Sequence, residues 1–222
     1  VVHGGGPRIK RELEKSNIES KFIRGLRVTD KKIINIVESV LIDFNNDIVN
    51  SLNKNGPKAI SIHTKENNII EVIPEEKELG YVGIPNKIDN NILKDVISQK
   101  KIPIISPLGL GGNNQTYNIN GDTAAGAIAK SLKSRRLFLM TNVEGVLDKK
   151  KKLIEEISSQ EVLKMIKDGT ITEGMIPKIN TCLDAVNNGV TAVGIIDGRK
   201  KHSILFEIFS DKGSGTLIRK WT

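Results

Sequence analysis

Apolar residues recur at helical spacing over much of this 222-residue chain. The longest apolar stripe follows Thr29, a candidate N-cap, and continues to about residue 53. Small apolar residues after Gly121 and Asp122 predict another helix, in which an aspartate in the first turn complements the positive end of the helix dipole. Further helices are expected over residues 8–16, 89–98, 158–168, 174–189 and 202–210. In the last of these, Ile204, Leu205 and Ile208 are expected to pack inward.

The remaining apolar runs predict strands that alternate with the helices. Buried strands are expected at 102–107, 136–140 and 191–196, hairpin-like flanking strands at 59–63, 69–73 and 81–84, and a final strand after a turn within 211–218. The segment 109–112 is expected to be a mobile loop. Because several strands are continuous apolar runs, the pattern predicts an α/β fold, with a mainly parallel central sheet covered by helices on both faces as a three-layer αβα sandwich.

Composition places the chain among ordinary soluble proteins, with 38% hydrophobic and 27% charged residues. The sequence contains no apolar run of membrane-spanning length and no signal peptide, so we expect a cytoplasmic protein without a membrane partner. The single cysteine, Cys182, lies among apolar residues at helical spacing and is interpreted as a packed thiol. Three scattered histidines give no zinc-ligand spacing, and no metal site is predicted on the chain itself.

The net charge of +8 permits nucleic-acid binding but does not favour it. Basic residues are spread along the chain, and the run 149–152 reads as a solvated turn. Aromatic residues make up only 4%, too few for a base-stacking surface. A small anionic substrate explains the positive net charge equally well, so no nucleic-acid partner is predicted.

The chain opens with Val1–His3, which resembles the end of a buried strand, followed by Gly4, Gly5, Gly6 and Pro7. Three glycines between a strand and a helix let backbone N–H groups approach a ligand, and the helix dipole there favours an anion. The spacing matches neither the Rossmann nor the P-loop fingerprint. Because no element precedes this strand, we expect the sequence to be a fragment.

Three polar residues are candidates for holding a small ligand. Arg27 stands between a glycine and the candidate N-cap, and is either a surface arginine or a bidentate clamp on a carboxylate. Asn118 and Asn120 occupy alternate positions before the small-residue helix, a pattern that capping does not require. Their amides suit a carboxylate or an amide group.

The segment 142–147 follows the apolar run 136–140 directly. Ligands of open α/β sheets bind beyond the carboxyl ends of strands. This segment is therefore a candidate nucleotide site.

Five motifs occur in the order seen in N-acetylglutamate kinases, and the chain resembles that branch of the amino acid kinase family over essentially its whole length. The motifs are His3–Pro7, Gly25–Thr29, Asn118–Asp122, Asn142–Val146 and Gly174–Lys178. The resemblance implies the amino acid kinase fold as a single domain, with an acetylglutamate-binding lobe over about residues 1–130 and an ATP-binding lobe over about 131–222. It also implies phosphorylation of the side-chain carboxylate of N-acetyl-L-glutamate by ATP in arginine biosynthesis, with Mg²⁺ held mainly by the phosphates, and a homo-oligomer.

The resemblance also implies residue roles. Gly5 and Gly6 would supply backbone donors near the transferring phosphoryl group. Lys178 would neutralise that group, and Asp122 would hold catalytic lysines in place. The substrate would be bound by Gly5, Gly6, Arg27, Asn118 and Asn120, and the nucleotide by Asn142, Val143, Glu144, Gly145, Val146, Leu147, Thr170, Ile171 and Thr172.

The chemistry of the residues agrees with these roles. The acceptor carboxylate is already ionised at neutral pH and needs no general base, and the sequence offers no obvious one. Phosphoryl transfer then depends on positioning and on cations and N–H donors around the phosphoryl oxygens. One departure is that the family's first strand and its phosphate-contacting lysine are missing from the sequence.

The C-terminal segment resembles the arginine-inhibited branch of these kinases. His202, Glu207, Gly213 and Gly215 would bind L-arginine, with Glu207 pairing with a cationic group. The glycines are equally suited to making a turn.

Two rival functions remain open from the sequence alone. One is a sister kinase acting on aspartate, glutamate or carbamate, against which Arg27 and Asn118 argue. The other is a non-catalytic arginine-sensing module.

Overall fold

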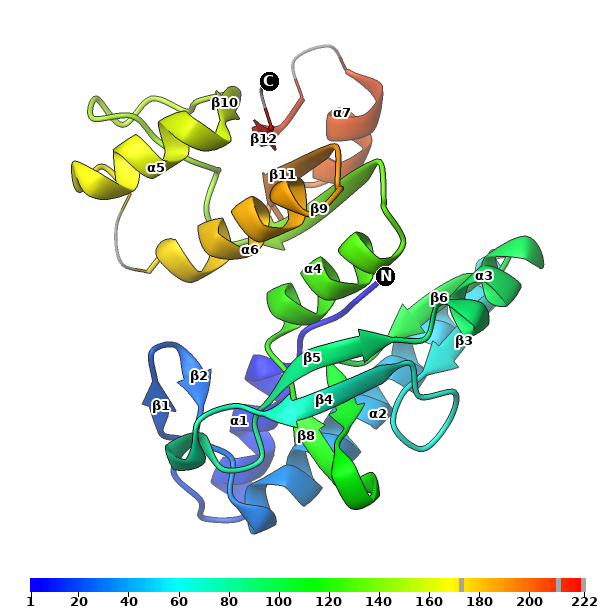
Figure 1. The fold of residues 1–222 in the computed structure, drawn as a ribbon. Helices are drawn as coiled ribbons and strands as arrows, with labels where there is room; N and C mark the ends of the chain where they lie inside the picture. The colour runs from blue at the N-terminus through cyan, green and yellow to red at the C-terminus, as the bar shows by residue number, and fades with distance from the viewer. Residues whose placement is uncertain (172–173, 211–212, 221–222) are drawn as a thin grey trace. The chain divides into compact units, whose positions relative to one another are not determined.

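The computed structural model describes residues 1–171, 174–210 and 213–220, apart from the side chain of Asn113 (Figure 1). The chain divides into two compact units, Val1–Ala124 and Ala125–Thr222. Both units combine helices with sheets, and the predicted α/β class is confirmed. The sheets are mixed rather than purely parallel.

The first unit combines one four-stranded sheet and two two-stranded sheets with helices. Its elements are α1 (Gly6–Lys15), β1 (Phe22–Ile23), β2 (Leu26–Arg27), α2 (Lys31–Lys54), β3 (Ala59–Ile62), β4 (Ile70–Pro74), the 3₁₀ turn η1 (Lys77–Leu79), β5 (Gly83–Ile88), α3 (Asn90–Ser98), β6 (Ile102–Ile105), β7 (Leu108–Leu110), the 3₁₀ turn η2 (Gly112–Asn114) and β8 (Thr116–Asn118). The helix α4 (Gly121–Ser131) begins in the last residues of this unit.

The strands of this unit pair in both directions. A four-stranded sheet has the order β5-β4-β7-β8, in which β4 and β5 form the expected antiparallel hairpin and β4 runs parallel to β7. The strands β3 and β6 pair in parallel, and Val2 adds a parallel bridge to Ile105. Helices α1 and α2 pack through Ile9, Leu13 and Leu41, whose side chains are buried together with Leu108 of β7.

The second unit is built on one four-stranded sheet with the order β10-β12-β11-β9. Its elements after α4 are β9 (Arg136–Thr141), β10 (Glu156–Ser158), α5 (Ser159–Lys167), α6 (Ile176–Asn187), β11 (Ala192–Asp197), α7 (Ser203–Phe209) and β12 (Gly215–Arg219). The pairs β9–β11 and β10–β12 are parallel, whereas β11 and β12 are antiparallel. Every residue of β11 is buried, and Cys182 of α6 is packed in the same core, as predicted.

Three sequence-based expectations are wrong. The N-cap of α2 is Asp30, whose Oδ1 accepts hydrogen bonds from the amides of Lys32 and Ile33, because the Thr29 hydroxyl instead donates to the Arg27 carbonyl. The segment 109–112 is not simply a loop, since Gly109 lies in β7, where a Cβ would approach Val72 Cγ1 to 2.5 Å.

The third correction concerns α7, which turns a polar face inward. Ser203 and Glu207 are buried, whereas Ile204, Leu205 and Ile208 are exposed. The helix has only seven residues, so its apolar side chains do not define one face by periodicity alone.

Candidate active site

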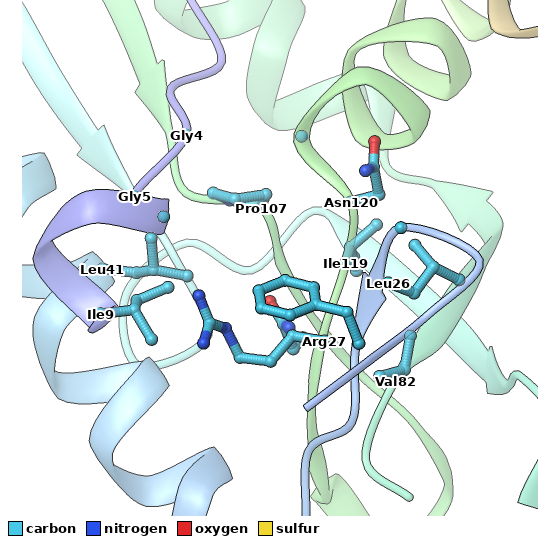
Figure 2. Close-up of a pocket in the computed structure, with 15 residues that line it drawn as sticks. Gly4, Gly5, Ile9, Leu26, Arg27, Leu41, Val82, Pro107, Ile119 and Asn120 are labelled. Carbon is cyan, nitrogen blue, oxygen red and sulfur yellow. The ribbon is translucent and has the colours of Figure 1, made fainter. Parts of the chain in front are cut away.

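A pocket of about 200 Å³ opens in the first unit, where segments far apart in the sequence meet (Figure 2). It brings together Gly5, Gly6, Arg27, Asn118 and Asn120, all of the predicted substrate-binding residues. The other residues that line it are Gly4, Ile9, Phe22, Gly25, Leu26, Leu41, Val82, Pro107, Ile119 and Gly121. Glycine backbone, three polar side chains and an apolar wall therefore surround one small volume.

A tight hairpin carries Arg27 to the pocket. Arg24 and Gly25 both have positive φ angles, of 49° and 80°, and they form a two-residue connection between β1 and β2. Two consecutive positive φ angles are characteristic of the type I′ turn, which matches the twist of paired strands. The resulting register places Phe22 opposite Arg27.

Arg27 is a buried cation, with 8% of its surface exposed. Its Nη1 donates to the Ser20 hydroxyl, and its Cζ lies 4.7 Å from the centroid of the Phe22 ring. Burial lowers the pKa of Arg27, although a guanidinium stays protonated in proteins. No carboxylate of the described residues forms an ion pair with it. Because a buried charge is costly unless it is paired, this arrangement suits an anionic ligand group.

The glycine loop leads into the N-terminus of α1. Gly5 is the N-cap, with no side chain to satisfy the free amides, and Pro7 occupies the first turn. A Cβ on Gly5 would lie 2.4 Å from Leu41 Cδ2, whereas one on Gly6 would meet nothing within 4 Å. The loop thus presents backbone donors at the positive end of a helix, which favours a negatively charged ligand.

The two asparagines have different local roles. The Nδ2 group of Asn118 lies 3.4 Å from the Thr29 hydroxyl, to which it donates. The Oδ1 of Asn120 accepts from the amides of Asp122 and Thr123, at 2.9 and 3.2 Å, and so caps α4. Capping therefore uses the oxygen of Asn120, and what this side chain can offer a ligand is its NH₂ group.

The two predicted catalytic side chains each lie in the first turn of a helix. Asp122 belongs to the start of α4 in the first unit. Lys178 belongs to the start of α6 in the second unit and is half-buried. Both positions match the sequence expectation of a helix start.

The predicted nucleotide loop connects β9 to the rest of the second unit. The amide of Val146 donates to Thr216 Oγ1 at 2.8 Å, and Gly145 has a φ of 145°, which disfavours other residues. Val146 and Ile171 are buried in the core of this unit, and the Val146 carbonyl accepts from the Ile154 amide at 2.9 Å. Asn142 and Glu144 are exposed, and Glu144 pairs with Lys200 at 3.4 Å.

The region after α5 is only partly described. Thr170 donates through its amide and its hydroxyl to Asp168 Oδ1, at 3.0 and 2.5 Å. The bond from the Thr170 hydroxyl, then the bond from Lys149 and then the bond from the Thr170 amide lower the pKa of Asp168 to about 2. Thr172, also predicted to contact the nucleotide, lies outside the described residues.

The predicted arginine-binding segment lies around α7. The carboxylate of Glu207 accepts from the amide of Ser214 at 2.8 Å. Gly213 has a φ of 66°, and a Cβ there would lie 2.8 Å from Glu207 Oε2. A Cβ on Gly215 would lie 2.0 Å from the Ile195 carbonyl of the paired strand. Packing against the neighbouring strand therefore requires glycine at 215, and the positive φ favours it at 213. His202 precedes α7 with a left-handed backbone.

Sequence reasoning missed the residues that support the predicted ones. Ser20 and Phe22 contact the Arg27 guanidinium, and Thr216 holds the Val146 amide. The Arg24–Gly25 pair was a readable hairpin signal that would have placed Phe22 across from Arg27. Nothing local in the sequence marks Thr216, which meets Val146 only through the tertiary fold.

Among the described residues, no helix is both long and apolar enough to cross a bilayer. The sequence model of the amino acid kinase family matches residues 1–197. An acetylglutamate kinase of Pelagibacter ubique (strain HTCC1062) is 58% identical over 220 residues, which cover 99% of this chain and 76% of the relative. An acetylglutamate kinase of Methylobacterium nodulans is 45% identical over 234 residues, which cover 99% of this chain and 77% of the relative.

Solved structures share the fold as well. The crystal structure of smu.665 from Streptococcus mutans UA159 superposes with a TM-score of 0.84 at 32% identity. The match covers 98% of this chain and 84% of the solved one.

Proposed function

We propose that this chain, which belongs to the amino acid kinase family and is a kinase of the acetylglutamate kinase type, transfers the γ-phosphoryl group of MgATP to the side-chain carboxylate of N-acetyl-L-glutamate. One bond forms between a carboxylate oxygen and the γ-phosphorus, and the bond from that phosphorus to the β,γ-bridging oxygen breaks. ADP leaves, and the product is an acyl phosphate that serves arginine biosynthesis.

The observation that carries this proposal is the buried Arg27 in a small pocket that also contains Asn118 and the glycine loop. N-acetyl-L-glutamate has an α-carboxylate, an amide and a reacting carboxylate. The Arg27 guanidinium would bind the α-carboxylate through two parallel hydrogen bonds, and the Asn118 amide would contact the acetamido group. The reacting carboxylate would then lie towards the backbone donors of Gly5 and Gly6.

The chemical step would rely on charge stabilisation rather than on a base. The acceptor oxygen is already negative, and donors fixed around the phosphoryl oxygens stabilise the charge that moves in the transition state. Lys178 would supply the cation and Asp122 would orient lysine side chains. Residues of about 1–130 would form the substrate lobe, and those of about 131–222 the nucleotide lobe. There Asn142–Leu147 and Thr170–Thr172 would line the nucleotide, whose phosphates would hold Mg²⁺.

A regulatory site is a further part of the proposal. The buried carboxylate of Glu207, next to the Gly213–Gly215 turn, would pair with a cationic group of L-arginine, and His202 would lie nearby in sequence. Arginine would then inhibit its own synthesis. We also propose that the protein assembles into a homo-oligomer and is located in the cytoplasm. Membership of the amino acid kinase family supports both proposals.

The test measures ADP release and acyl phosphate formation together. The protein is incubated with MgATP and N-acetyl-L-glutamate, L-glutamate, L-aspartate or carbamate, and hydroxylamine traps the acyl phosphate as a hydroxamate. We expect ADP and hydroxamate in equal amounts with N-acetyl-L-glutamate and a far lower kcat/KM with the others. Preference for another acceptor would assign the chain to a sister activity, and binding of arginine without any turnover would favour a sensing module.

A further inference from the structure

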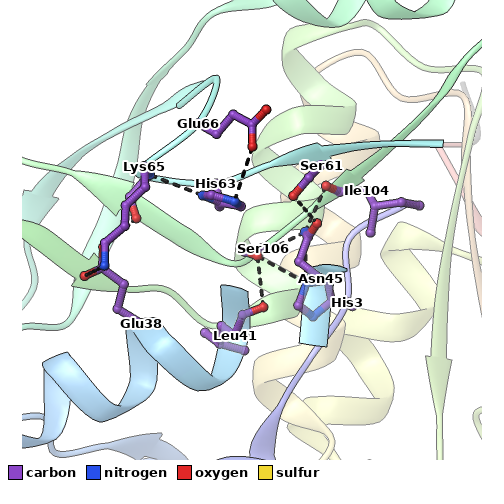
Figure 3. Close-up of polar contacts among 11 residues, drawn as sticks. His3, Glu38, Leu41, Asn45, Ser61, His63, Lys65, Glu66, Ile104 and Ser106 are labelled. Atoms are coloured by element: carbon purple, nitrogen blue, oxygen red, sulfur yellow. Dashed lines mark hydrogen bonds and ion pairs between the residues drawn. The ribbon is translucent and has the colours of Figure 1, made fainter. Parts of the chain in front are cut away.

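Four buried polar side chains form a network directly before the glycine loop (Figure 3). His3 precedes Gly4 in the chain, Asn45 comes from the middle of α2, Ser61 from β3, and Ser106 follows β6. Buried polar groups of this kind persist when they are fully hydrogen-bonded. None of them is part of the pocket lining, so the proposed chemistry does not explain them.

The orientation of Asn45 is fixed by its partners. Its Nδ2 donates to the Ile104 carbonyl at 2.9 Å, and its Oδ1 accepts from the Ser61 hydroxyl at 2.6 Å. A carbonyl can only accept, so the NH₂ group must be on that side. The same NH₂ group lies 3.2 Å from His3 Nε2. His3 Nε2 also lies 3.2 Å from the Ser106 hydroxyl, which accepts from the same NH₂ group at 3.0 Å.

The Gly4 carbonyl sets the tautomer of His3. Nδ1 lies 2.9 Å from this carbonyl, which can only accept, so Nδ1 carries the proton and donates it. In the neutral ring, Nε2 then presents a lone pair to Asn45 Nδ2 and the Ser106 hydroxyl, each at 3.2 Å. Burial lowers the pKa of His3, in agreement with a neutral ring.

The Gly4 carbonyl and the Gly5 N–H are opposite edges of one peptide unit. The described backbone contains no cis peptide, so the two groups point in opposite directions. Gly5 lines the pocket, and its N–H makes no hydrogen bond within the described residues. Fixing the carbonyl towards His3 therefore also fixes the direction of an unused donor at the pocket wall.

We propose that His3 is a positioning residue, whose Nδ1–H holds the Gly4 carbonyl so that the Gly5 N–H is preorganised for the phosphoryl group. This inference rests on the proposed function for its role in turnover. It adds that the loop is set from the buried side, through a backbone carbonyl, rather than by the ligand. Preorganised donors stabilise a transition state because they need no reorganisation as the charge moves.

The two amide replacements of His3 separate positioning from packing. In His3→Asn, the amide nitrogen lies close to where Nδ1 was and can still donate to the Gly4 carbonyl. In His3→Gln, the amide group reaches towards the Nε2 position and loses that donor. His63→Gln is the matched control, since His63 is another buried histidine of the same unit that lies outside the pocket lining. Thermal unfolding of each variant measures the structural cost.

We expect His3→Gln to lower kcat by about tenfold or more, because a misdirected donor loses much of the effect of an aimed one. His3→Asn should retain most of kcat, although both variants unfold at lower temperature than the unmutated protein. His63→Gln should affect only unfolding. Equal loss of kcat in both His3 variants, or no loss in either, would overturn the positioning role.

A second measurement does not depend on turnover. Inorganic phosphate is titrated into ¹⁵N-glycine-labelled protein, and the Gly5 amide shift is followed. We expect a saturable shift in the unmutated protein and in His3→Asn, and a weakened one in His3→Gln. An unchanged response in His3→Gln refutes the inference. If the unmutated protein showed no turnover but the shifts followed the expected pattern, the proposed function would be refuted. The positioning of the Gly5 N–H by His3 would still stand.

Discussion

The guanidinium carbon of Arg27 lies 4.7 Å from the centroid of the Phe22 ring, across the turn that joins β1 to β2. The two residues form a directly opposed pair in the hairpin register. The ring covers one face of the cation, while the edge of the planar group keeps its N–H donors. A carboxylate can therefore approach in the plane without displacing the ring.

Replacing Arg27 by lysine should raise the KM for N-acetyl-L-glutamate by about tenfold or more, with a smaller effect on kcat, because a point charge cannot reproduce two parallel hydrogen bonds. Steady-state kinetics with each substrate varied in turn measures this. Arg24→Lys is the matched control, since Arg24 lies in the same hairpin but is exposed and pairs with Glu76 and Glu78. A change confined to the KM for ATP would place Arg27 on the nucleotide side.

Replacing Phe22 by leucine should raise the same KM by about two- to fivefold, the size expected from loss of one cation–π contact. The substitution keeps an apolar side chain and removes the ring face. Phe209→Leu serves as the comparison, because Phe209 is a solvent-exposed phenylalanine of the second unit. Identical kinetics for Phe22→Leu and the unmutated protein would show that the ring does not contribute to binding.

Lys178→Ala should reduce kcat by about a hundredfold or more and leave the affinity for N-acetyl-L-glutamate nearly intact. A cation that acts on the moving charge contributes mainly to the transition state, on the scale found for oxyanion donors. Equilibrium binding and single-turnover rates separate the two effects. Lys167→Ala, an exposed lysine at the end of α5, controls for loss of charge. A normal turnover number would exclude Lys178 from the site.

Asp197 should contribute to stability in a defined acidic range. Its carboxylate accepts from Arg199 Nε and Nη2, both at 2.9 Å, and these bonds lower its pKa to about 2. The pKa in the folded state is therefore below that of an unfolded aspartate, about 3.9. The contribution of Asp197 to the free energy of unfolding is fully present at pH values above the unfolded pKa. It is lost as the pH falls through the folded pKa.

Urea unfolding between pH 6 and pH 2 tests this expectation. The unfolding free energy of the unmutated protein should fall more steeply below about pH 4 than that of Asp197→Asn, so that the difference between the two shrinks as the pH approaches 2. Glu155→Gln, which removes an exposed carboxylate from the same unit, provides the reference. Parallel curves for Asp197→Asn and the unmutated protein would contradict the assignment.

L-Arginine at millimolar concentration should inhibit the protein, and Glu207→Gln should weaken that inhibition by about tenfold or more, since a charged hydrogen-bonded contact is lost. The substitution keeps the size of the side chain and an oxygen acceptor for the Ser214 amide. The measurement is initial rate against arginine concentration, with L-lysine as the ligand control. Insensitivity of the unmutated protein, or equal inhibition of both, would refute this site.

The sequence by itself determined the α/β class, because long apolar runs and helical stripes reflect interactions within one element. It also determined the family, through motifs such as His3–Pro7 and Asn118–Asp122 whose order does not depend on geometry. The helix starts at Gly121 and near Lys178 were readable from capping chemistry and proline position. These signals come from residues that are close together in the sequence, so they can be read without knowledge of the tertiary structure.

Only the tertiary structure decided which groups meet and which faces are buried. Thr29 had the chemistry of an N-cap, yet its hydroxyl bonds to the Arg27 carbonyl and Asp30 takes the cap. In the short helix α7, Glu207 is buried and bonded to the Ser214 amide, whereas Leu205 is exposed. His3 became informative only when the fold placed Asn45, 42 residues away, beside its ring. Tertiary packing brings His3 and Asn45 together from distant segments. It also sets the backbone geometry that selects among nearby partners for Thr29 and Glu207. Periodicity and capping patterns in the sequence do not specify that geometry.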